Sequence, residues 1–253
     1  MSKIVSIHSY RGGTGKSNST ANLAVAVAQK GYRVGIVDTD IQSPGIHILF
    51  DIDQEQIEHT LNDFLWGRCT IADAACDITS VLADKATKAS RIYLVPSSVK
   101  INDISRILRE RFDGELLLAG FKDLIKNLNL DYLFIDTHPG LNQETLITLT
   151  TSDIVLLVLR PDQQDFQGTA VTVDVARRLR VPKLLLLINK ALVEYDFDDL
   201  RQQVEQNYQA PVAAIIPESH DIIRLASSSI FCLQYPNHAI SQVIEKVAQQ
   251  IVN

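Results

Sequence analysis

Cysteine is scarce in this chain. The 253 residues include three cysteines, one methionine and one tryptophan. The cysteines, Cys69, Cys76 and Cys232, are odd in number, and no two of them form a Cys-x-x-Cys pair. This pattern does not indicate a disulfide framework, which needs paired cysteines in an oxidising environment. We therefore expect buried free thiols in a reducing compartment.

Long hydrophobic runs are also missing. No apolar run approaches the ~18 residues that a membrane-spanning helix needs. The first residues, Met1–Ile4, lead directly into a strand-like pattern and have no secretory or transit character. We therefore expect a cytoplasmic protein.

The chain has no excess of basic residues. It contains 24 Lys and Arg against 30 Asp and Glu, which gives a formal net charge of −6. An acidic chain is not expected to bind nucleic acid constitutively, although a local basic patch is compatible with this balance.

The chain does contain continuous apolar runs separated by helical patterns. Because the runs do not alternate with polar residues, they are typical of parallel strands covered on both faces. The pattern predicts a doubly wound α/β fold with a mostly parallel sheet of seven to eight strands, in a single domain over residues 1–253. The expected strands are Lys3–His8, Arg33–Asp38, Arg91–Pro96, Asp131–Asp136, Asp153–Arg160, Lys183–Asn189 and Val212–Pro217. The expected helices include Ile57–Leu65, Leu116–Leu128 and Thr169–Leu179.

A glycine-rich segment, Ser9–Asn18, lies between the first strand and a helical stretch. Glycines let consecutive N–H groups converge on an anion, and the start of a helix adds further free N–H groups. Lys16 is placed to reach the β- and γ-phosphates of a nucleotide, and the Ser17 hydroxyl is a natural Mg²⁺ ligand. The residues expected to bind phosphate are Arg11, Gly12, Gly13, Thr14, Gly15, Lys16, Ser17 and Asn18.

This segment departs from the ordinary P-loop, because Tyr10 stands six residues before Lys16, where that pattern has glycine. A basic residue followed by Gly-Gly-x-Gly-Lys-Ser resembles the deviant P-loop of the MinD/ParA family of ATPases. In that family the leading basic residue is usually a signature lysine that reaches the partner's nucleotide in an ATP-sandwiched dimer. Here it is Arg11, which can grip phosphate through two parallel hydrogen bonds. The resemblance implies a catalytic role for Arg11 in trans, although a role within its own subunit is the alternative.

Two acidic segments follow strands two and four. Asp38 and Asp40 point the same way from extended backbone at the end of the second strand. By resemblance this is switch I, where Asp40 positions or activates the attacking water and Asp38 lies near the Mg²⁺ shell or supports Lys16. Asp136 ends the fourth strand as a Walker B residue, and His138 follows it in a loop that resembles switch II. We expect His138 to pack or hydrogen-bond rather than to act as a base. The expected Mg²⁺ ligands are Ser17, Asp40 and Asp136.

The resemblance also implies the base site. Asn189 ends strand six, and its amide offers both a donor and an acceptor to the adenine edge. Pro217 and Glu218 follow strand seven, where the family closes over the purine and ribose. A guanine-specific Asn-Lys-x-Asp is absent, so ATP with Mg²⁺ is expected rather than GTP. The missing Cys-x-x-Cys pair separates the chain from the iron-sulfur branches of the superfamily.

The docking surface is less defined. The tail over residues 239–253 has an apolar stripe but little positive charge, so we expect it to pack on the domain and not to bind lipid. Two basic groups are candidates for non-specific DNA binding in a dimer. They are Arg177, Arg178, Arg180 and Lys183, and Arg106, Arg109 and Arg111.

Together these elements predict an ATP-driven dimerisation switch. Hydrolysis is expected to be slow without an unidentified activating or cargo-adaptor protein. The switch is expected to position or partition DNA, a division complex or another large cargo. The alternative is a regulatory scaffold clamped by nucleotide, with negligible turnover.

Overall fold

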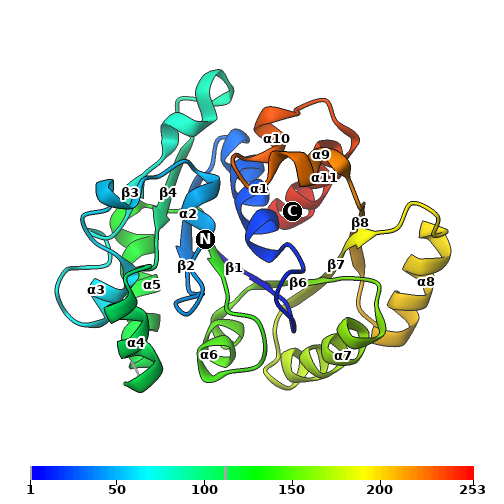
Figure 1. Cartoon of the computed structure of the whole chain (residues 1–253), viewed down its shortest axis with the longest axis horizontal. Coiled ribbons are helices and arrows are strands. Elements are labelled where there is room, and N and C mark those ends of the chain that lie inside the picture. The colour runs from blue at the N-terminus through cyan, green and yellow to red at the C-terminus, as the bar shows by residue number, and fades with distance from the viewer. Residues whose placement is uncertain (1, 111–112) are drawn as a thin grey trace.

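The computed structural model describes residues 2–110 and 113–253. Its apolar runs form one eight-stranded sheet with the order β3-β4-β2-β5-β1-β6-β7-β8 (Figure 1). Neighbouring strands are parallel except at the edge, where β3 pairs antiparallel to β4. The strands are β1 (Lys3–His8), β2 (Arg33–Asp38), β3 (Cys76–Asp77), β4 (Arg91–Val95), β5 (Tyr132–Asp136), β6 (Ile154–Leu159), β7 (Lys183–Ala191) and β8 (Val212–Pro217).

Helices cover both faces of the sheet (Figure 1). The α-helices are α1 (Lys16–Gln29), α2 (Ile46–Leu49), α3 (Leu61–Leu65), α4 (Ile101–Arg109), α5 (Gly114–Leu128), α6 (Gln143–Thr151), α7 (Gln163–Arg178), α8 (Phe197–Tyr208), α9 (His220–Leu225), α10 (Phe231–Gln234) and α11 (Ala239–Val252). Short 3₁₀ segments span Gln54–Gln56 and Thr79–Lys85. The fold predicted from the sequence is confirmed.

Side-chain alternation along the strands divides the core. In β5, Tyr132 and Phe134 pack in the cluster that contains α1, α10 and α11. Leu133 and Ile135 point to the opposite face and pack with α3 and α5. A third cluster joins α7 and α8 to β6, β7 and β8. Because both faces are buried, the strands are apolar throughout, as the sequence indicated.

All seven predicted strands are present, with ends that differ by up to two residues. The eighth strand, β3, has only two residues and no detectable pattern in the sequence. The helix expected over Ile57–Leu65 is wrong at its start. It begins only at Leu61, because Thr60 and Asp63 form a capping box whose two side chains bond to each other's backbone N–H.

Two other helices begin earlier than expected, each after an aspartate that caps its first turn. Asp113 accepts a hydrogen bond from the backbone N–H of Glu115 at the start of α5. Asp162 accepts from two backbone N–H groups at the start of α7. Such caps satisfy backbone N–H groups that have no partner within the helix. The position of the capping residue, and not the apolar stripe, therefore determines where each helix begins.

The tail helix α11 packs on the domain, as expected. Its apolar stripe, including Ile240, Ile244 and Val247, is buried in the same cluster as α1. The three cysteines are free, but only Cys232 is buried, and Cys69 and Cys76 are partly exposed. Among the described residues, no helix has the length and apolar character needed to span a membrane.

Candidate functional site

The glycine-rich loop connects β1 to α1 and leaves space for a ligand. Gly13 and Gly15 have φ angles of 78° and 93°, in the left-handed region that favours glycine. A Cβ atom added at Gly13 would meet no heavy atom within 4 Å. A Cβ atom at Gly15 would lie 2.3 Å from Nδ2 of Asn189, so this position also needs glycine for close packing.

The helix that follows the loop is open at its N-terminus. Gly15 is the N-cap of α1 and makes no side-chain cap. The first N–H groups of a helix have no intrahelical acceptor, and the helix dipole favours an anion at this point. The loop and the start of α1 therefore form a cradle suited to phosphate.

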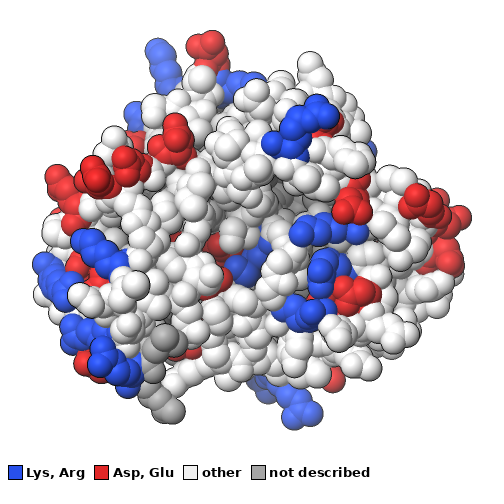
Figure 2. Space-filling view, in the orientation of Figure 1, with Lys and Arg blue, Asp and Glu red and all other residues white. Residues whose placement is uncertain are grey.

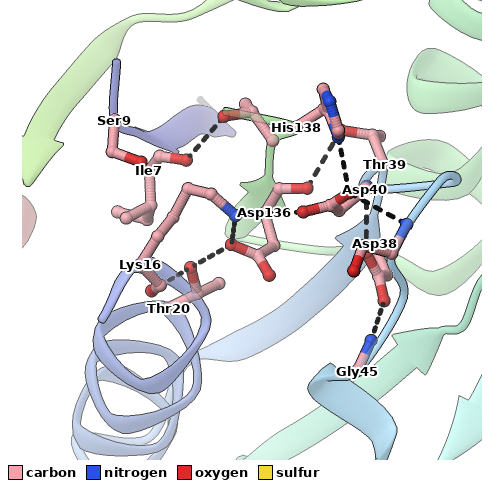
Figure 3. Close-up of polar contacts among 12 residues, drawn as sticks. Ile7, Ser9, Lys16, Thr20, Asp38, Thr39, Asp40, Gly45, Asp136 and His138 are labelled. Carbon is pink, nitrogen blue, oxygen red and sulfur yellow. Dashed lines mark hydrogen bonds and ion pairs between the residues drawn. The ribbon is translucent and has the colours of Figure 1, made fainter. Parts of the chain in front are cut away.

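Lys16 lies over this cradle between two acidic residues (Figure 3). Its Nζ is 3.2 Å from Oδ1 of Asp136 and 3.7 Å from Oδ2 of Asp40. Burial alone would lower the pKa of Lys16, but the negative charges of Asp136, Asp40 and Asp38 outweigh it and raise the pKa. Lys16 is therefore a fixed cation held by two of the predicted site residues.

Strand register brings the acidic residues together. Asp38 is paired with Asp136 in the β2–β5 ladder, and Thr39 donates to the Asp136 carbonyl from its backbone N–H at 2.9 Å. The carboxylate of Asp38 organises the loop that follows, because its oxygens accept hydrogen bonds from the backbone N–H groups of Asp40 (3.0 Å) and Gly45 (3.3 Å). Full burial and the neighbouring Asp136 and Asp40 raise the pKa of Asp38 well above its ordinary value.

The residues present fit a magnesium ion. Oδ1 of Asp136 accepts from Lys16 and from the Thr20 hydroxyl at 3.1 Å, whereas its buried Oδ2 has no hydrogen-bond partner. A buried carboxylate oxygen without a partner is costly unless a ligand or an ion satisfies it. Three carboxylates, from Asp38, Asp40 and Asp136, face the single cation of Lys16. Among the described residues, no three His, Cys, Asp or Glu side chains are arranged to hold a metal ion by themselves. Mg²⁺ does not need such a set, because it is commonly held by one or two carboxylates plus waters and substrate phosphates.

His138 lies in the same cluster. Its Nδ1 is 2.6 Å from Oδ1 of Asp40 (Figure 3). The expectation that His138 forms a hydrogen bond holds, but its partner is the residue predicted to orient the attacking water. No signal in the local sequence indicated this contact, since the two residues are 98 positions apart.

The Arg11 side chain contacts the start of α7 and not the acidic residues around Lys16. Its guanidinium lies 3.6 Å from Asp162 and 3.7 Å from Asp165, at the start of α7. Arg160 also contacts both aspartates. The Arg11 side chain is 38% exposed. Within a single chain, therefore, Arg11 forms an intramolecular ionic cluster that the sequence did not indicate.

A cavity of about 400 Å³ lies beside the cradle. Its lining includes the predicted residues Asn18, Asn189, Pro217 and Glu218. Asn189 donates from Nδ2 to the Thr14 carbonyl at 2.7 Å, which ties the end of β7 to the loop. The volume and the mixed lining suit a nucleoside.

The rest of this cavity comes from residues that sequence reasoning missed. Its apolar wall is contributed by α1, β7, β8 and the C-terminal helices. The lining residues of this wall include Leu23, Leu187, Ile216, Ile222, Phe231, Ile240, Ile244 and Val247. These residues look like ordinary core positions in the sequence, so only their arrangement around a hollow identifies them.

Figure 2 shows a recess in the middle of one face, with charged side chains of both signs around it. The arrangement provides backbone donors and Lys16 for phosphate, carboxylates for a hydrated cation, and an adjacent cavity for a base. This set of groups suits a nucleoside polyphosphate with a divalent cation.

Comparisons with known proteins agree with this geometry. The family model described as "AAA domain" matches residues 2–192. An uncharacterized ATP-binding protein of Methanocaldococcus jannaschii is 25% identical over 254 residues, which cover 100% of this chain and 88% of that protein.

Two solved structures share the fold. The cell division ATPase MinD of Pyrococcus furiosus superposes with a TM-score of 0.82 at 25% identity, covering 100% of this chain and 99% of that one. The septum site-determining protein MinD of Pyrococcus horikoshii, complexed with Mg-ADP, gives a TM-score of 0.80 at 24% identity, covering 99% and 96%. The matched AAA domain extends over most of the chain, and the fold is that of MinD. The chain therefore belongs to the MinD/ParA family of P-loop ATPases.

Proposed function

We propose that this chain is an ATP-dependent dimerisation switch that hydrolyses ATP slowly and responds to an activating partner protein. Through this cycle it would position or partition DNA, a division complex or another large cargo. The observation that carries the proposal is the placement of Lys16 between Asp40 and Asp136 beside an open glycine loop. In this arrangement Lys16 would bind a phosphate and the carboxylates would bind the cation that accompanies it.

The similar proteins support an adenine nucleotide as the ligand and cell division or partitioning as the kind of process. The protein of Pyrococcus furiosus is named a cell division ATPase, and that of Pyrococcus horikoshii binds Mg-ADP. In this chain we assign Mg²⁺ to Ser17 and Asp136, with Asp40 in the same shell. The metal ion would neutralise charge on the phosphates and bring them into line for attack. Asp40 would orient the attacking water.

Arg11 would act across the dimer in place of the signature lysine. To do so it must leave Asp162 and Asp165. The pair with Asp162 is partly exposed and contributes only about 0–1 kcal/mol, so an incoming phosphate can replace it. The Asp165 side chain is only 2% exposed, so it needs another cation when Arg11 leaves. Arg160 stays in contact with both aspartates and compensates their charge after Arg11 departs. An arginine on the transferring phosphate accelerates phosphoryl transfer by about 10³–10⁵-fold in other systems.

The test is nucleotide-dependent self-association measured by light scattering, together with phosphate release. With Mg-ATP the parent chain is expected to form a dimer, and with Mg-ADP a monomer. Asp40→Ala should accumulate the ATP dimer, because the water is no longer oriented. Arg11→Ala should bind ATP but neither dimerise nor hydrolyse at the parent rate. Arg178→Ala, an exposed arginine near the end of α7, serves as the matched control and should behave as the parent.

Two outcomes would contradict parts of the proposal. An Arg11→Ala protein that dimerised and hydrolysed normally would remove the role in trans. An ATP dimer that showed negligible turnover even with its activating partner present would instead support a nucleotide-clamped scaffold.

A further inference from the structure

The hydrogen bond between Asp40 and His138 joins the two loops that flank the phosphate site. It connects the loop after β2 to the loop after β5, with 2.6 Å between Oδ1 and Nδ1. Both side chains are largely shielded from water, at 11% exposure for Asp40 and 23% for His138. A short bond to a shielded carboxylate is among the stronger hydrogen bonds in proteins.

The backbone that carries His138 is well anchored. Its carbonyl accepts a hydrogen bond from the Thr145 hydroxyl in α6 at 3.3 Å. Two residues later, the backbone N–H of Gly140 donates to the Ser9 carbonyl at 3.1 Å, at the start of the glycine loop. Pro139, between them, fixes its own φ angle. The imidazole therefore extends from a segment held to both α6 and the phosphate cradle.

The chemistry of the pair sets the position of the proton. An ionised carboxylate only accepts hydrogen bonds, so Nδ1 of His138 must carry the hydrogen. In the neutral ring, Nε2 is then left as an acceptor. This is the opposite of the tautomer that free neutral histidine favours in water, so it is a measurable signature of the contact.

The contact also fixes the orientation of the Asp40 carboxylate. Oδ1 is occupied by His138 and by the backbone N–H of Ser43 at 3.3 Å. Oδ2 is left on the side of the phosphate loop, 3.7 Å from Nζ of Lys16. Rotation of the carboxylate would break the bond to His138, so one oxygen is held toward the place where a terminal phosphate and its water would lie.

We propose that His138 is a positioning residue for ATP hydrolysis, which holds the Asp40 carboxylate with Oδ2 facing the phosphate loop. This inference rests on the proposed ATPase function. His138 need not touch the substrate, because its effect passes through Asp40. Misplacement of a catalytic group by about 1 Å can cost on the order of 10²-fold in rate, and a loss of 10- to 100-fold is expected here.

The first test needs no nucleotide. Two-dimensional ¹H–¹⁵N spectra of the imidazole rings should show His138 as the Nδ1–H tautomer in the parent protein at mildly alkaline pH. In Asp40→Ala the ring should revert to the Nε2–H tautomer. An Nε2–H ring in the parent, or spectra that do not change in Asp40→Ala, would overturn the inference even if the protein is an active ATPase.

The second test is a set of single-turnover hydrolysis rates. His138→Ala should lower the rate 10- to 100-fold and leave the affinity for a fluorescent ATP analogue within twofold. His138→Asn should recover most of the rate, because its amide nitrogen can donate from nearly the same place as Nδ1. His59→Ala, which removes a histidine near Asp73 and outside this cluster, should match the parent.

A double-mutant cycle separates positioning from a general effect on folding. In the Asp40→Asn background, where the oriented carboxylate is already lost, His138→Ala should lower the rate by less than twofold. A full further loss in that background, or a parent rate in His138→Ala alone, would contradict the inference. A parent protein that binds ATP but does not hydrolyse it would count against the proposed function, and the tautomer measurement would then decide on the Asp40–His138 contact by itself.

Discussion

At the scale of single residues, His8 shows how the site controls charge by burial. It ends β1, is fully buried, and its Nδ1 contacts the Thr137 hydroxyl at 2.7 Å. That hydroxyl donates to the Ile7 carbonyl, so it accepts the hydrogen that Nδ1 of His8 carries. Burial, followed by the positive charges of Lys16 and of His138 when protonated, lowers the pKa of His8 to about 3.

This buried histidine predicts a specific loss of stability in acid. The unfolded chain takes up a proton on His8 near pH 6.5, and the folded chain only near pH 3, so stability falls as pH drops through this window. Between pH 7.5 and 4.5 the loss is about 3 kcal/mol. Urea unfolding at both pH values should show this loss of stability in the parent. His8→Asn keeps a donor to Thr137, and its free energy of unfolding should fall by about 3 kcal/mol less over the same pH range. Equal losses in both proteins would show that His8 already titrates normally in the folded state.

At the scale of elements, the start of the phosphate loop is fastened to α7. The ring of Tyr10 packs so closely on Gly168 that a Cβ atom there would lie 1.9 Å from Cδ1 of the ring. Arg11 reaches the first turn of the same helix through Asp162 and Asp165. Tyr10 stands where an ordinary P-loop has glycine, and this packing gives the departure a structural reason.

The contact can be tested with a compensating pair of substitutions. Gly168→Ala alone should displace the Tyr10 ring, lower the free energy of unfolding and weaken binding of Mg-ATP. In a Tyr10→Ala background the clash is gone, and the same change should stabilise the protein by about 0.5–1 kcal/mol through helix propensity. Urea unfolding of the four proteins measures this. A stabilising effect of Gly168→Ala in both backgrounds would mean that the Tyr10 ring moves aside freely.

Elements were predictable where the physical signal is local. The buried strands and the residues at their carboxyl ends could be placed from the sequence, because parallel strands are apolar throughout and ligands bind at those ends. Asp40, Asp136 and Lys16 therefore meet as expected. The Asp40–His138 contact, the attachment of Arg11 to α7 and the apolar wall of the cavity could not be placed, because each depends on how distant segments pack. The assigned roles of the site residues stay predictions.

At the scale of the whole molecule, basic and acidic side chains are mixed on the surface that carries the site, and neither sign forms one large patch there. Figure 2 shows basic and acidic side chains interspersed over the face that carries the recess. Several candidate cations for DNA have partners within the chain. Arg177 donates to the carbonyls of Tyr208 and Gln209 at the end of α8, and Lys183 donates to the Gln250 carbonyl in α11. The sequence-derived patch near the end of α7 is thereby reduced to Arg178 and Arg180, which are exposed.

The second basic group is similarly engaged. The Arg106 guanidinium lies 4.5 Å from the centre of the Trp66 ring, and its Nε bonds to Glu110. Arg109 donates from Nε to the Ser105 carbonyl at 3.1 Å. Arg111 lies outside the described residues. If DNA is the surface on which the protein docks, Arg178 and Arg180, doubled in a dimer, are the better candidates.

This leads to a prediction for the trapped dimer. Asp40→Ala should bind a DNA duplex of arbitrary sequence at low salt with Mg-ATP and not with Mg-ADP. Each cation that neutralises a phosphate contributes about −0.9 to the slope of log K against log salt. Adding Arg178→Glu and Arg180→Glu should abolish binding while the dimer persists by light scattering, and an Arg109→Glu change should have a smaller effect. A confirmed ATP dimer that does not bind DNA even at low salt would exclude DNA docking and leave a protein scaffold or a membrane as the surface on which the cycle operates.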